Sequence, residues 1–570
     1  SEGSSGLTIC HTKFSFNTAT DFGGGVCLKS VTDATISGCV FSDNMADHDD
    51  GGAVVYDKGM GGAIACLQSS LTVTNCFFEW NAAQVSKAGG VPTEKSAGGG
   101  GDIYVNTGTL RLLDSVSANA RAGVLKDPVA LSPNEAKLYF TGDGGSILVH
   151  GEKSNTSVEI RDCRFEDSVS YGNGGTVSFS KDSSPEARTY FVLGRPSFQW
   201  PPATAEPVAL GGGCIGLISN STFTASQGGW HGGAISANGR GMDIDILDSI
   251  FRRCKGGTTH KRDGKGGAVS VGGGLQTDAP PVNDVLVANC LMENCSASGN
   301  GGSMYVTIRG KLRIEDTLID GCSALNEGQG LPLPTDDHRK VEGMGGGIHV
   351  SAGGHLYLKG GSPGSMQIGN CNAAVNGGGI SIKSGRAFFS GNLEFEGNNA
   401  NGSAVDGYGN GGGVFVTTSY HDDKRRFGAG WGAATLYDCH GEIWSSSSDV
   451  FISKNRANCW GGGLYVGISP PWYGSSTRKG NLAMITLMGA NIHTNTALQA
   501  ANESPLKPAQ IAAERVKDNL ANLNFKDTNI SGDSTTDIGI YLWDSIVPYT
   551  EGTIFGALAA PTITEGTEAP

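Results

Sequence analysis

The sequence predicts an all-β fold, a right-handed parallel β-helix of about 13 coils with loop insertions and one short helix near the C-terminus. Three observations predict it. Glycine supplies 90 of 570 residues, paired glycines recur directly before short alternating apolar runs, and a second motif precedes each pair. The stretch "CWGGGLYVGI" from Cys459 shows the first motif. Glycine usage this far above the average of about 7% indicates a repeated structural demand.

The second motif reads F-x-x-N-x-A. Its thirteen copies begin at Phe14, Phe41, Phe78, Val116, Phe165, Phe223, Phe251, Met292, Ile319, Ile368, Phe395, Ile452 and Ile492. Where no loop intervenes, a glycine pair begins nine residues later, and the shortest distance between copies is 27 residues. Such a coil accommodates three short strands and their turns, and stacked coils bury one face of each strand.

Two residue types are expected at the corners of the coil. Glycine alone combines a positive φ with the absence of a Cβ, so it suits a corner that passes close to the same corner above and below. Asn17, Asn44, Asn81 and Asn119 are expected to adopt the left-handed conformation and to bond to stacked neighbours. Crossover chirality favours a right-handed coil.

The C-terminal part reads differently. A helix is predicted over residues 508–525, because Ile511, Val516, Leu520 and Leu523 lie near one helical face. The chain therefore divides into a repeat domain with insertions (1–497), a helical insertion with the last coil or cap (498–548) and a tail or linker (549–570). The chain opens within a repeat, which indicates a processed or partial chain.

Net charge and cysteine content indicate which partners the chain can bind and in which compartment it is located. A formal charge of −14 argues against a nucleic-acid or anionic-membrane partner, and no run of about 18 apolar residues could span a bilayer. Fourteen cysteines and six Asn-x-Ser/Thr triplets fit an extracellular or cell-surface location. The candidate glycosylation sites are Asn155, Asn220, Asn294, Asn401, Asn502 and Asn529.

The pairing of G-G-A-I with F-x-x-N resembles the polymorphic outer-membrane protein repeats of bacterial surface proteins. "GGAI" stands at Gly61 and Gly232, F-x-x-N stands at Phe14, Phe41, Phe78 and Phe395, and the resemblance covers residues 7–497. It implies a secreted, surface-displayed β-helix used for adhesion or assembly. The chain departs from the chlamydial adhesins of that family, because no C-terminal membrane barrel is recognisable.

The cysteines fall into two neighbouring columns of the coil. Cys39, Cys76, Cys163 and Cys290 precede the large apolar residue by two positions, and Cys254, Cys295, Cys322 and Cys371 replace the Asn of the motif. Equivalent residues of adjacent coils lie about 4.8 Å apart, a Cα separation that a disulfide accepts. Disulfides within the pairs Cys39–Cys76 and Cys295–Cys322 are therefore expected, and buried thiols that fill small spaces are the alternative. No C-x-x-C pair supports a zinc site.

Acidic runs raise the alternative of an enzyme. A β-helix that cleaves polysaccharide needs clustered carboxylates, often with Ca²⁺, on one strand face. The candidates are Asp47–Asp50, Asp336–Lys340 and His421–Arg426, which fall in insertions of separate coils and read better as solvated loop charge. Calcium binding by Asp47, Asp49 and Asp50 is the alternative for the first run. We therefore assign no catalytic, cofactor or metal residue.

A column of larger side chains marks a candidate contact surface. The residue between the two inward apolar positions after the glycines is Tyr305, His349, Ser381, Phe415 and Tyr465 in five consecutive late coils. An outward aromatic ridge could stack on sugar rings or pack against another rod. The alternative is that the long insertions fold over it.

The sequence thus favours a non-enzymatic extracellular protein, a structural or adhesive rod that forms or decorates a surface layer, filament, appendage or matrix. Its expected partners are other copies of itself, other surface proteins or glycans. The competing hypothesis is a carbohydrate-binding or polysaccharide-degrading β-helix.

Overall fold

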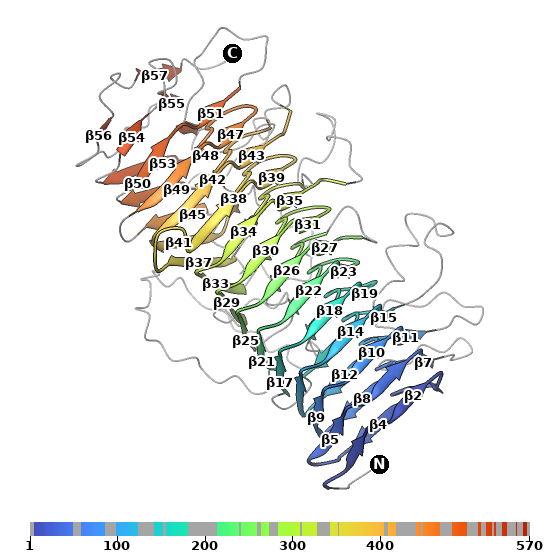
Figure 1. Cartoon of the computed structure of the whole chain (residues 1–570). Helices are drawn as coiled ribbons and strands as arrows, with labels where there is room; N and C mark the ends of the chain where they lie inside the picture. The colour runs from blue at the N-terminus through green and yellow to red at the C-terminus, as the bar shows by residue number, and fades with distance from the viewer. Residues whose placement is uncertain are drawn as a thin grey trace, which may run out of the picture.

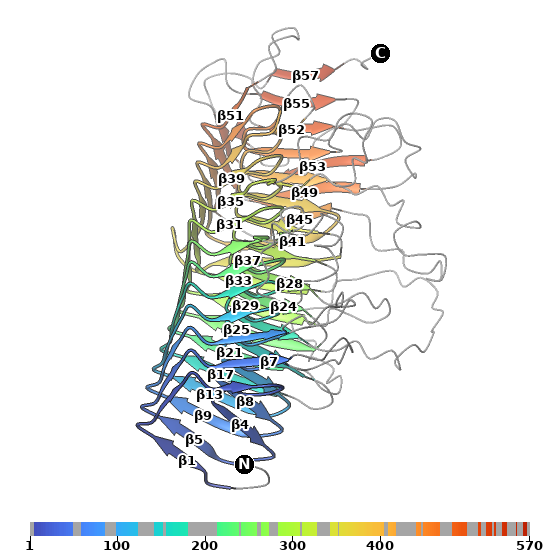
Figure 2. The same cartoon turned by 90° about the vertical axis from the view of Figure 1, so that its right-hand side faces the viewer.

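The computed structural model is a right-handed parallel β-helix (Figure 1). It describes residues 5–48, 59–85, 98–123, 142–151, 156–180, 214–238, 241–258, 264–272, 283–307, 310–327, 342–351, 353–403, 408–417, 441–445, 449–467, 482–488, 490–498, 511–514, 520–526, 529–531, 539–543, 554–555 and 562–566. Within these ranges every strand pairs with its equivalent one coil away, always in parallel, and the coils stack along one axis (Figure 2).

The strands form four sheets, which we number in the order in which the chain visits them. Sheet 1 contains β1 (Thr8–Cys10), β5 (Ala34–Ser37), β9 (Ser70–Thr74), β13 (Thr109–Leu113), β17 (Thr156–Arg161), β21 (Cys214–Ser219), β25 (Met242–Leu247), β29 (Asn283–Ala288), β33 (Gly310–Glu315), β37 (His355–Gly360), β41 (Arg386–Gly391), β45 (Gly441–Ser445), β49 (Leu482–Met488) and β53 (Leu520–Lys526). Sheet 2, which carries the F-x-x-N motif, contains β2 (Lys13–Ser15), β6 (Val40–Ser42), β10 (Phe77–Glu79), β14 (Val116–Ala118), β18 (Arg164–Glu166), β22 (Thr222–Thr224), β26 (Ile250–Arg252), β30 (Leu291–Glu293), β34 (Leu318–Asp320), β38 (Met366–Gly369), β42 (Leu393–Glu396), β46 (Val450–Ser453), β50 (Ala490–His493), β54 (Asn529–Ser531) and β56 (Ile554–Phe555).

The other two sheets follow in the coil. Sheet 3 contains β3 (Thr18–Ala19), β7 (Met45–His48), β11 (Ala82–Val85), β15 (Arg121–Ala122), β19 (Val169–Ser170), β23 (Gln227–Gly228), β27 (Lys255–Gly256), β31 (Ser296–Ala297), β35 (Ser323–Ala324), β39 (Asn372–Ala373), β43 (Asn399–Ala400), β47 (Arg456–Ala457) and β51 (Thr496–Ala497). Sheet 4, which follows the glycine pairs, contains β4 (Val26–Lys29), β8 (Ile64–Leu67), β12 (Ile103–Asn106), β16 (Ile147–His150), β20 (Val177–Ser180), β24 (Ile235–Asn238), β28 (Val269–Gly272), β32 (Met304–Val306), β36 (Ile348–Val350), β40 (Ile380–Lys383), β44 (Val414–Thr417), β48 (Leu464–Gly467), β52 (Ile511–Glu514), β55 (Gly539–Trp543) and β57 (Thr562–Gly566).

The predicted parallel β-helix is confirmed, and two details differ from expectation. A coil has four strands, because sheet 3 adds strands of two to four residues directly after the motif Asn. Where the helix was expected, β52 and β53 lie instead: Ile511 pairs with Leu464, and Leu520 with Leu482. Pairing with the preceding coil overrides a local helical pattern. Strands β56 and β57 lie in the expected tail, and the division at residues 497 and 548 stays a prediction.

The interior is a dry core of stacked columns. The motif's large residue points inward, and Phe14, Phe41 and Phe78 stack face to face with ring centroids 4.9 and 5.0 Å apart. Phe165, Phe223 and Phe251 repeat this stack at 5.1 and 4.8 Å. These spacings match the distance between paired strands, so the backbone ladder sets the ring spacing.

Residues in the left-handed conformation form the corners of the coil. Glycine takes this conformation as predicted, whereas the motif Asn in general does not. Gly232 has φ +68, and a Cβ there would lie 2.1 Å from the carbonyl oxygen of Ile235. Among the motif residues expected to be left-handed, only Asn119 is. The left-handed position is the residue before the Asn position of the motif: Phe16, Asp43, Trp80, Asn119, Asp167, Ala225, Arg253, Asn294, Gly321, Asn370, Gly397, Lys454 and Thr494. Asn119 belongs to this set because Phe78 pairs with Ser117 and not with Val116, so the fourth copy begins one residue later than the sequence predicted. Because these side chains differ widely, the stack imposes the conformation.

The motif Asn instead builds a buried hydrogen-bond ladder. Asn17 Nδ2 donates to Asn44 Oδ1 at 2.8 Å, Asn44 Nδ2 donates to Asn81 Oδ1 at 3.0 Å, and Asn81 Nδ2 donates to Asp102 Oδ1 at 2.9 Å. Asp102 also accepts the hydroxyl of Ser117, and it is 1% exposed. The ladder thus ends on a carboxylate in the core.

Asp102 should make the protein less stable as the pH rises. Burial raises its pKa to about 7, although hydrogen bonds from Ser117, Asn81 and Ser146 oppose the shift. The unfolded carboxyl ionises near 3.8, so the stabilisation is complete below pH 4 and is lost as the pH rises to about 7. We expect the free energy of unfolding to fall by roughly 4 kcal/mol over that interval.

The Asp102→Asn variant tests this, since its amide keeps the hydrogen bonds to Asn81 and Ser117 without an ionisation. The difference between variant and wild type in urea unfolding should grow in the variant's favour from pH 4 to pH 8. Asp143, whose pKa burial raises to about 6, provides a residual slope in both proteins. A pH-independent difference would contradict the assignment.

Candidate functional site: a charged and aromatic patch on sheet 1

The predicted contact column lies on sheet 4, and its side chains are buried. Tyr305, His349, Phe415 and Tyr465 are 4, 1, 0 and 1% exposed. Tyr305 stacks on His349 with ring centroids 5.6 Å apart, and Phe415 stacks on Tyr465 at 5.3 Å. Burial, with Lys383 and Lys265 nearby, holds the pKa of His349 well below its ordinary value. The column is therefore a buried aromatic ladder outside the main core, where Phe415 and Tyr465 form a cluster of their own, and this corrects the expectation of an exposed ridge.

Cys39 and Cys76 occupy a position that serine and threonine fill in other coils. The Sγ of each donates to the carbonyl two residues earlier, at 3.3 Å for Cys39 and 3.4 Å for Cys76, and the amide of Cys39 donates to Cys76 Sγ. Ser115 and Ser221 make the same local contact. The six cysteines expected to form disulfides are thiols in the structure: Cys39, Cys76, Cys254, Cys295, Cys322 and Cys371.

The glycosylation candidates are partly placed. Asn220, Asn294 and Asn401 are exposed, and Asn529 lies in β54. Asn155 and Asn502 lie outside the described residues. An exposed side chain meets the steric requirement for modification, and glycosylation at these positions stays a prediction.

The acidic runs do not come together in the described part of the chain. Asp47 lies in β7, whereas Asp49, Asp50 and the runs 336–340 and 421–426 fall outside the described ranges. No three His, Cys, Asp or Glu side chains of the described residues are close enough to hold a metal ion. Nor does any helix of these residues have the length and apolarity to cross a membrane.

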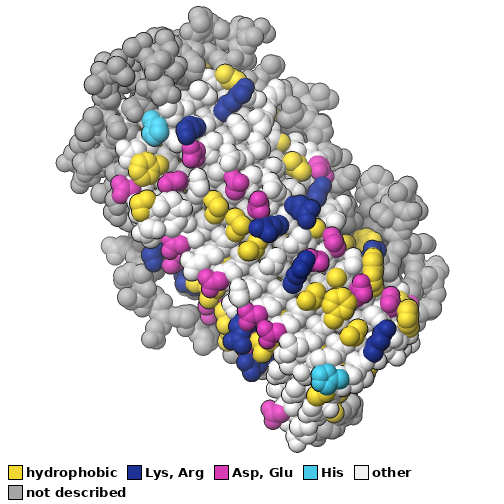
Figure 3. Space-filling model, viewed as in Figure 1, with side chains coloured by type: hydrophobic (Ala, Val, Ile, Leu, Met, Phe, Trp, Pro, Cys, Tyr) yellow, Lys and Arg dark blue, Asp and Glu magenta, His cyan; other side chains and the backbone are white. Residues whose placement is uncertain are grey.

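A different cluster lies on the outer face of sheet 1, on four neighbouring strands. Two outward columns of β25, β29, β33 and β37 supply what we call the sheet 1 patch: Asp243, Asp245, Asp284, Lys311, Arg313 and Tyr357. Asp243 pairs in register with Asp284, and Asp284 with Lys311. In Figure 3, acidic and basic side chains gather at the lower left, where Figure 1 labels β25, β29 and β33.

Ion pairs organise the middle of the patch. Lys311 Nζ lies 2.9 Å from Asp284 Oδ2, and Arg313 Nε lies 2.7 Å from Asp284 Oδ1. Lys311 Nζ also lies 5.4 Å from the centre of the Tyr357 ring, and that ring lies 6.3 Å from Phe388. Asp284 is thus held by two cations beside an aromatic pair, which fixes the side chains before any ligand arrives.

The carboxylates at the other end are less satisfied. Asp243 is exposed, and neither Asp243 nor Asp245 forms an ion pair with a described cation. Although Asp243 is exposed, neighbouring side chains remove part of its hydration and so raise its pKa, and the carboxyl groups of Asp284 and Asp245 raise it further. Burial and Asp284 likewise raise the pKa of Tyr357. The patch therefore presents hydrogen-bond acceptors at one end and an aromatic face at the other.

Sequence reasoning missed this patch, although a signal exists. In "MDIDI", "DVLV", "KLRI" and "HLYL", which begin at Met242, Asp284, Lys311 and His355, every second residue is apolar and points inward, so the residues between them lie on the outer face. Aligning these four segments by their inward residues would have placed the six side chains on adjacent strands.

Comparisons with known proteins add little. No family model and no curated protein matches the chain. A solved structure of a TibC-catalysed, hyper-glycosylated TibA fragment is similar over 99% of this chain and 100% of the fragment, with 9% identity and a TM-score of 0.20. Values this low carry no argument about function. The resemblance to polymorphic outer-membrane protein repeats therefore rests on the motifs alone.

Proposed function

We propose that this chain is an extracellular rod that binds carbohydrate through the sheet 1 patch, as an adhesive or matrix component. The observation that carries the proposal is the sheet 1 patch itself, in which six outward charged and aromatic side chains lie together on four adjacent strands. Carboxylates accept hydrogen bonds from sugar hydroxyls, and aromatic faces pack against sugar rings. From β25 to β37 the patch spans three strand spacings, about 14 Å. That length suits an oligosaccharide running along the rod axis.

Loss of Tyr357 should weaken binding. We expect Tyr357→Ala to lower the affinity for a bound polysaccharide about tenfold, equivalent to about 1.4 kcal/mol, because the aromatic face and its contact with Lys311 disappear. Affinity electrophoresis against a panel of neutral, uronic and sulfated polysaccharides measures this. The matched control is Glu293→Gln, which breaks the Arg252–Glu293 pair on sheet 2 and should leave the affinity unchanged. Equal losses in both variants, or no retardation of wild type, would contradict the proposal.

A second candidate function is polysaccharide cleavage at the same patch. Three carboxylates across two adjacent coils favour it, since Asp243, with its raised pKa, could act as a general acid beside Asp284, which is ion-paired with Lys311 and Arg313. Release of reducing ends, lost in Asp243→Asn while binding persists, would support cleavage. Binding without release in wild type leaves the rod as a binding protein.

Assembly is a separate part of the proposal. Self-association or attachment to other surface proteins is what a structural or adhesive rod requires, and light scattering with electron microscopy of the purified chain tests it. Monodisperse monomers over a wide concentration range would remove self-assembly while leaving carbohydrate binding intact.

A further inference from the structure

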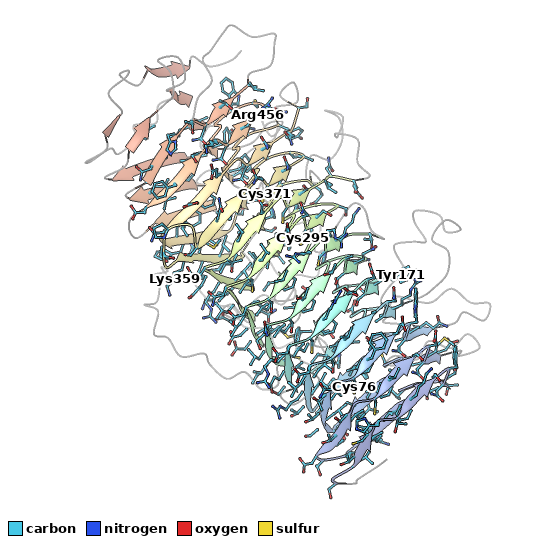
Figure 4. All side chains as sticks on the ribbon, in the orientation of Figure 1. Cys76, Tyr171, Cys295, Lys359, Cys371 and Arg456 are labelled. Atoms are coloured by element: carbon cyan, nitrogen blue, oxygen red, sulfur yellow. The ribbon has the colours of Figure 1, made fainter. Side chains whose placement is uncertain are left out.

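Four cysteines form an unbroken line through the middle of the rod. Cys254, Cys295, Cys322 and Cys371 precede residues that pair in register on β27, β31, β35 and β39, and each is 0% exposed. Neighbouring thiols hydrogen-bond to one another along the line. Figure 4 labels Cys295 and Cys371, which lie on either side of Cys322 along the axis.

These cysteines interrupt the asparagine ladder. Asn398, Asn455 and Asn495 hold the same position farther along, where each Nδ2 donates to a carbonyl of the preceding coil and successive amides bond to each other. A thiol reproduces the first contact, since Sγ of Cys254 and of Cys295 lies 3.5 and 3.6 Å from the corresponding carbonyl oxygens. In place of the second contact it has only the weaker thiol–thiol hydrogen bond. The four coils therefore lack the amide link between side chains, and a sulfur–sulfur bond is the link that cysteine can supply.

We infer that this line oxidises as two disulfides, Cys254–Cys295 and Cys322–Cys371. Adjacent coils place equivalent Cα atoms about 4.8 Å apart, within the range that a disulfide bridges. Only this pairing uses all four thiols. A central Cys295–Cys322 bond would leave Cys254 and Cys371 three strand spacings apart, about 14 Å, too far to pair.

The bonds must form while the chain folds. Cys254, Cys295, Cys322 and Cys371 are all 0% exposed, so an oxidant in solution cannot reach their thiols once the coils have closed. Before closure, one thiolate attacks the disulfide of an oxidant and releases its first thiolate. The second cysteine then displaces the oxidant's other sulfur. Two protein thiols are oxidised as one oxidant disulfide is reduced to two thiols, so the exchange balances.

Refolding in a glutathione redox buffer tests the pairing independently of where the protein resides. The full chain is reduced and unfolded, refolded with oxidised and reduced glutathione, alkylated under denaturing conditions and digested. Mass spectrometry should find the linked peptides Cys254–Cys295 and Cys322–Cys371. Cys163 should be alkylated, because Ser115 and Ser221 fill its column in the coils on either side. The native fold added to the same buffer should stay unpaired.

A variant makes the test sharper. In Cys254→Ser, the Cys322–Cys371 peptide should persist and Cys295 should be alkylated. A Cys295–Cys322 peptide in the wild type, or four alkylated thiols after refolding to the native state, would overturn the inference. The inference shares with the proposed function only the oxidising location, which the glutathione buffer replaces. Loss of carbohydrate binding would therefore leave it standing.

Discussion

Gly233→Ala should destabilise the rod by more than about 4 kcal/mol, a loss reserved for severe packing defects. The methyl carbon would lie 1.9 Å from the carbonyl oxygen of Gly267 and 2.5 Å from the amide nitrogen of Lys255. Both are backbone atoms held in ladders of the next coil, so neither can move aside. Hydrogen exchange of the Ile235 and Val269 amides, with urea unfolding, measures the loss.

The matched control separates crowding from backbone conformation. Gly364 has φ +76, and the nearest atom to an added methyl is Glu394 Oε1 at 3.9 Å. Gly364→Ala should therefore lower the free energy of unfolding by only about 1–2 kcal/mol, the cost of placing alanine in the left-handed conformation. If the two variants were equally destabilised, close approach of the coils would not be the reason for the second glycine of each pair.

Asn455→Ala should cost about 3–5 kcal/mol, because it leaves several buried polar groups unsatisfied. Asn455 Nδ2 donates to the Phe395 carbonyl at 2.8 Å and to Asn495 Oδ1 at 2.9 Å, and its Oδ1 accepts the amide and Nδ2 of Asn398. The side chain is fully buried, so water cannot replace these contacts. Urea unfolding at neutral pH measures the change.

Two further variants define the ladder's contribution. Asn399→Ala removes only contacts at 3.3 Å from a partly buried side chain, so it should cost less than about 1 kcal/mol. Asn455→Cys copies what the chain does at Cys254 and keeps the carbonyl contact, so its loss should fall between the two alanine variants. An alanine variant at 455 no worse than the one at 399 would refute the ladder as a source of stability.

The features that could be predicted from the sequence are those that recur in every coil, and the features without a recurring residue pattern were missed. Phe41 and Gly232 recur in type and spacing, so the core column and the glycine corner were visible. Sheet 3 was not, because strands such as β27, with two residues, carry no periodicity. The left-handed position was misassigned by one residue, since the corner accepts Trp80 as readily as Asp43.

The sheet 1 patch was missed for a different reason. Its residues come from strands separated by insertions of unequal length, and only the register places Asp243 beside Asp284 and Arg313 beside Tyr357. Outward positions have no common requirement from coil to coil, so no column of identical residues marks them. The prediction of a C-terminal helix was wrong because the segment of β52 pairs with the exposed edge of β48.

In all four sheets, each described strand is hydrogen-bonded only to the equivalent strands one coil before and one coil after it. A strand can therefore form on the edge of the preceding coil before any later part of the chain has folded, because that coil supplies its hydrogen-bond partners. Once one coil has formed, folding can therefore spread along the axis from coil to coil, and each new coil protects the strand edges of the coil before it.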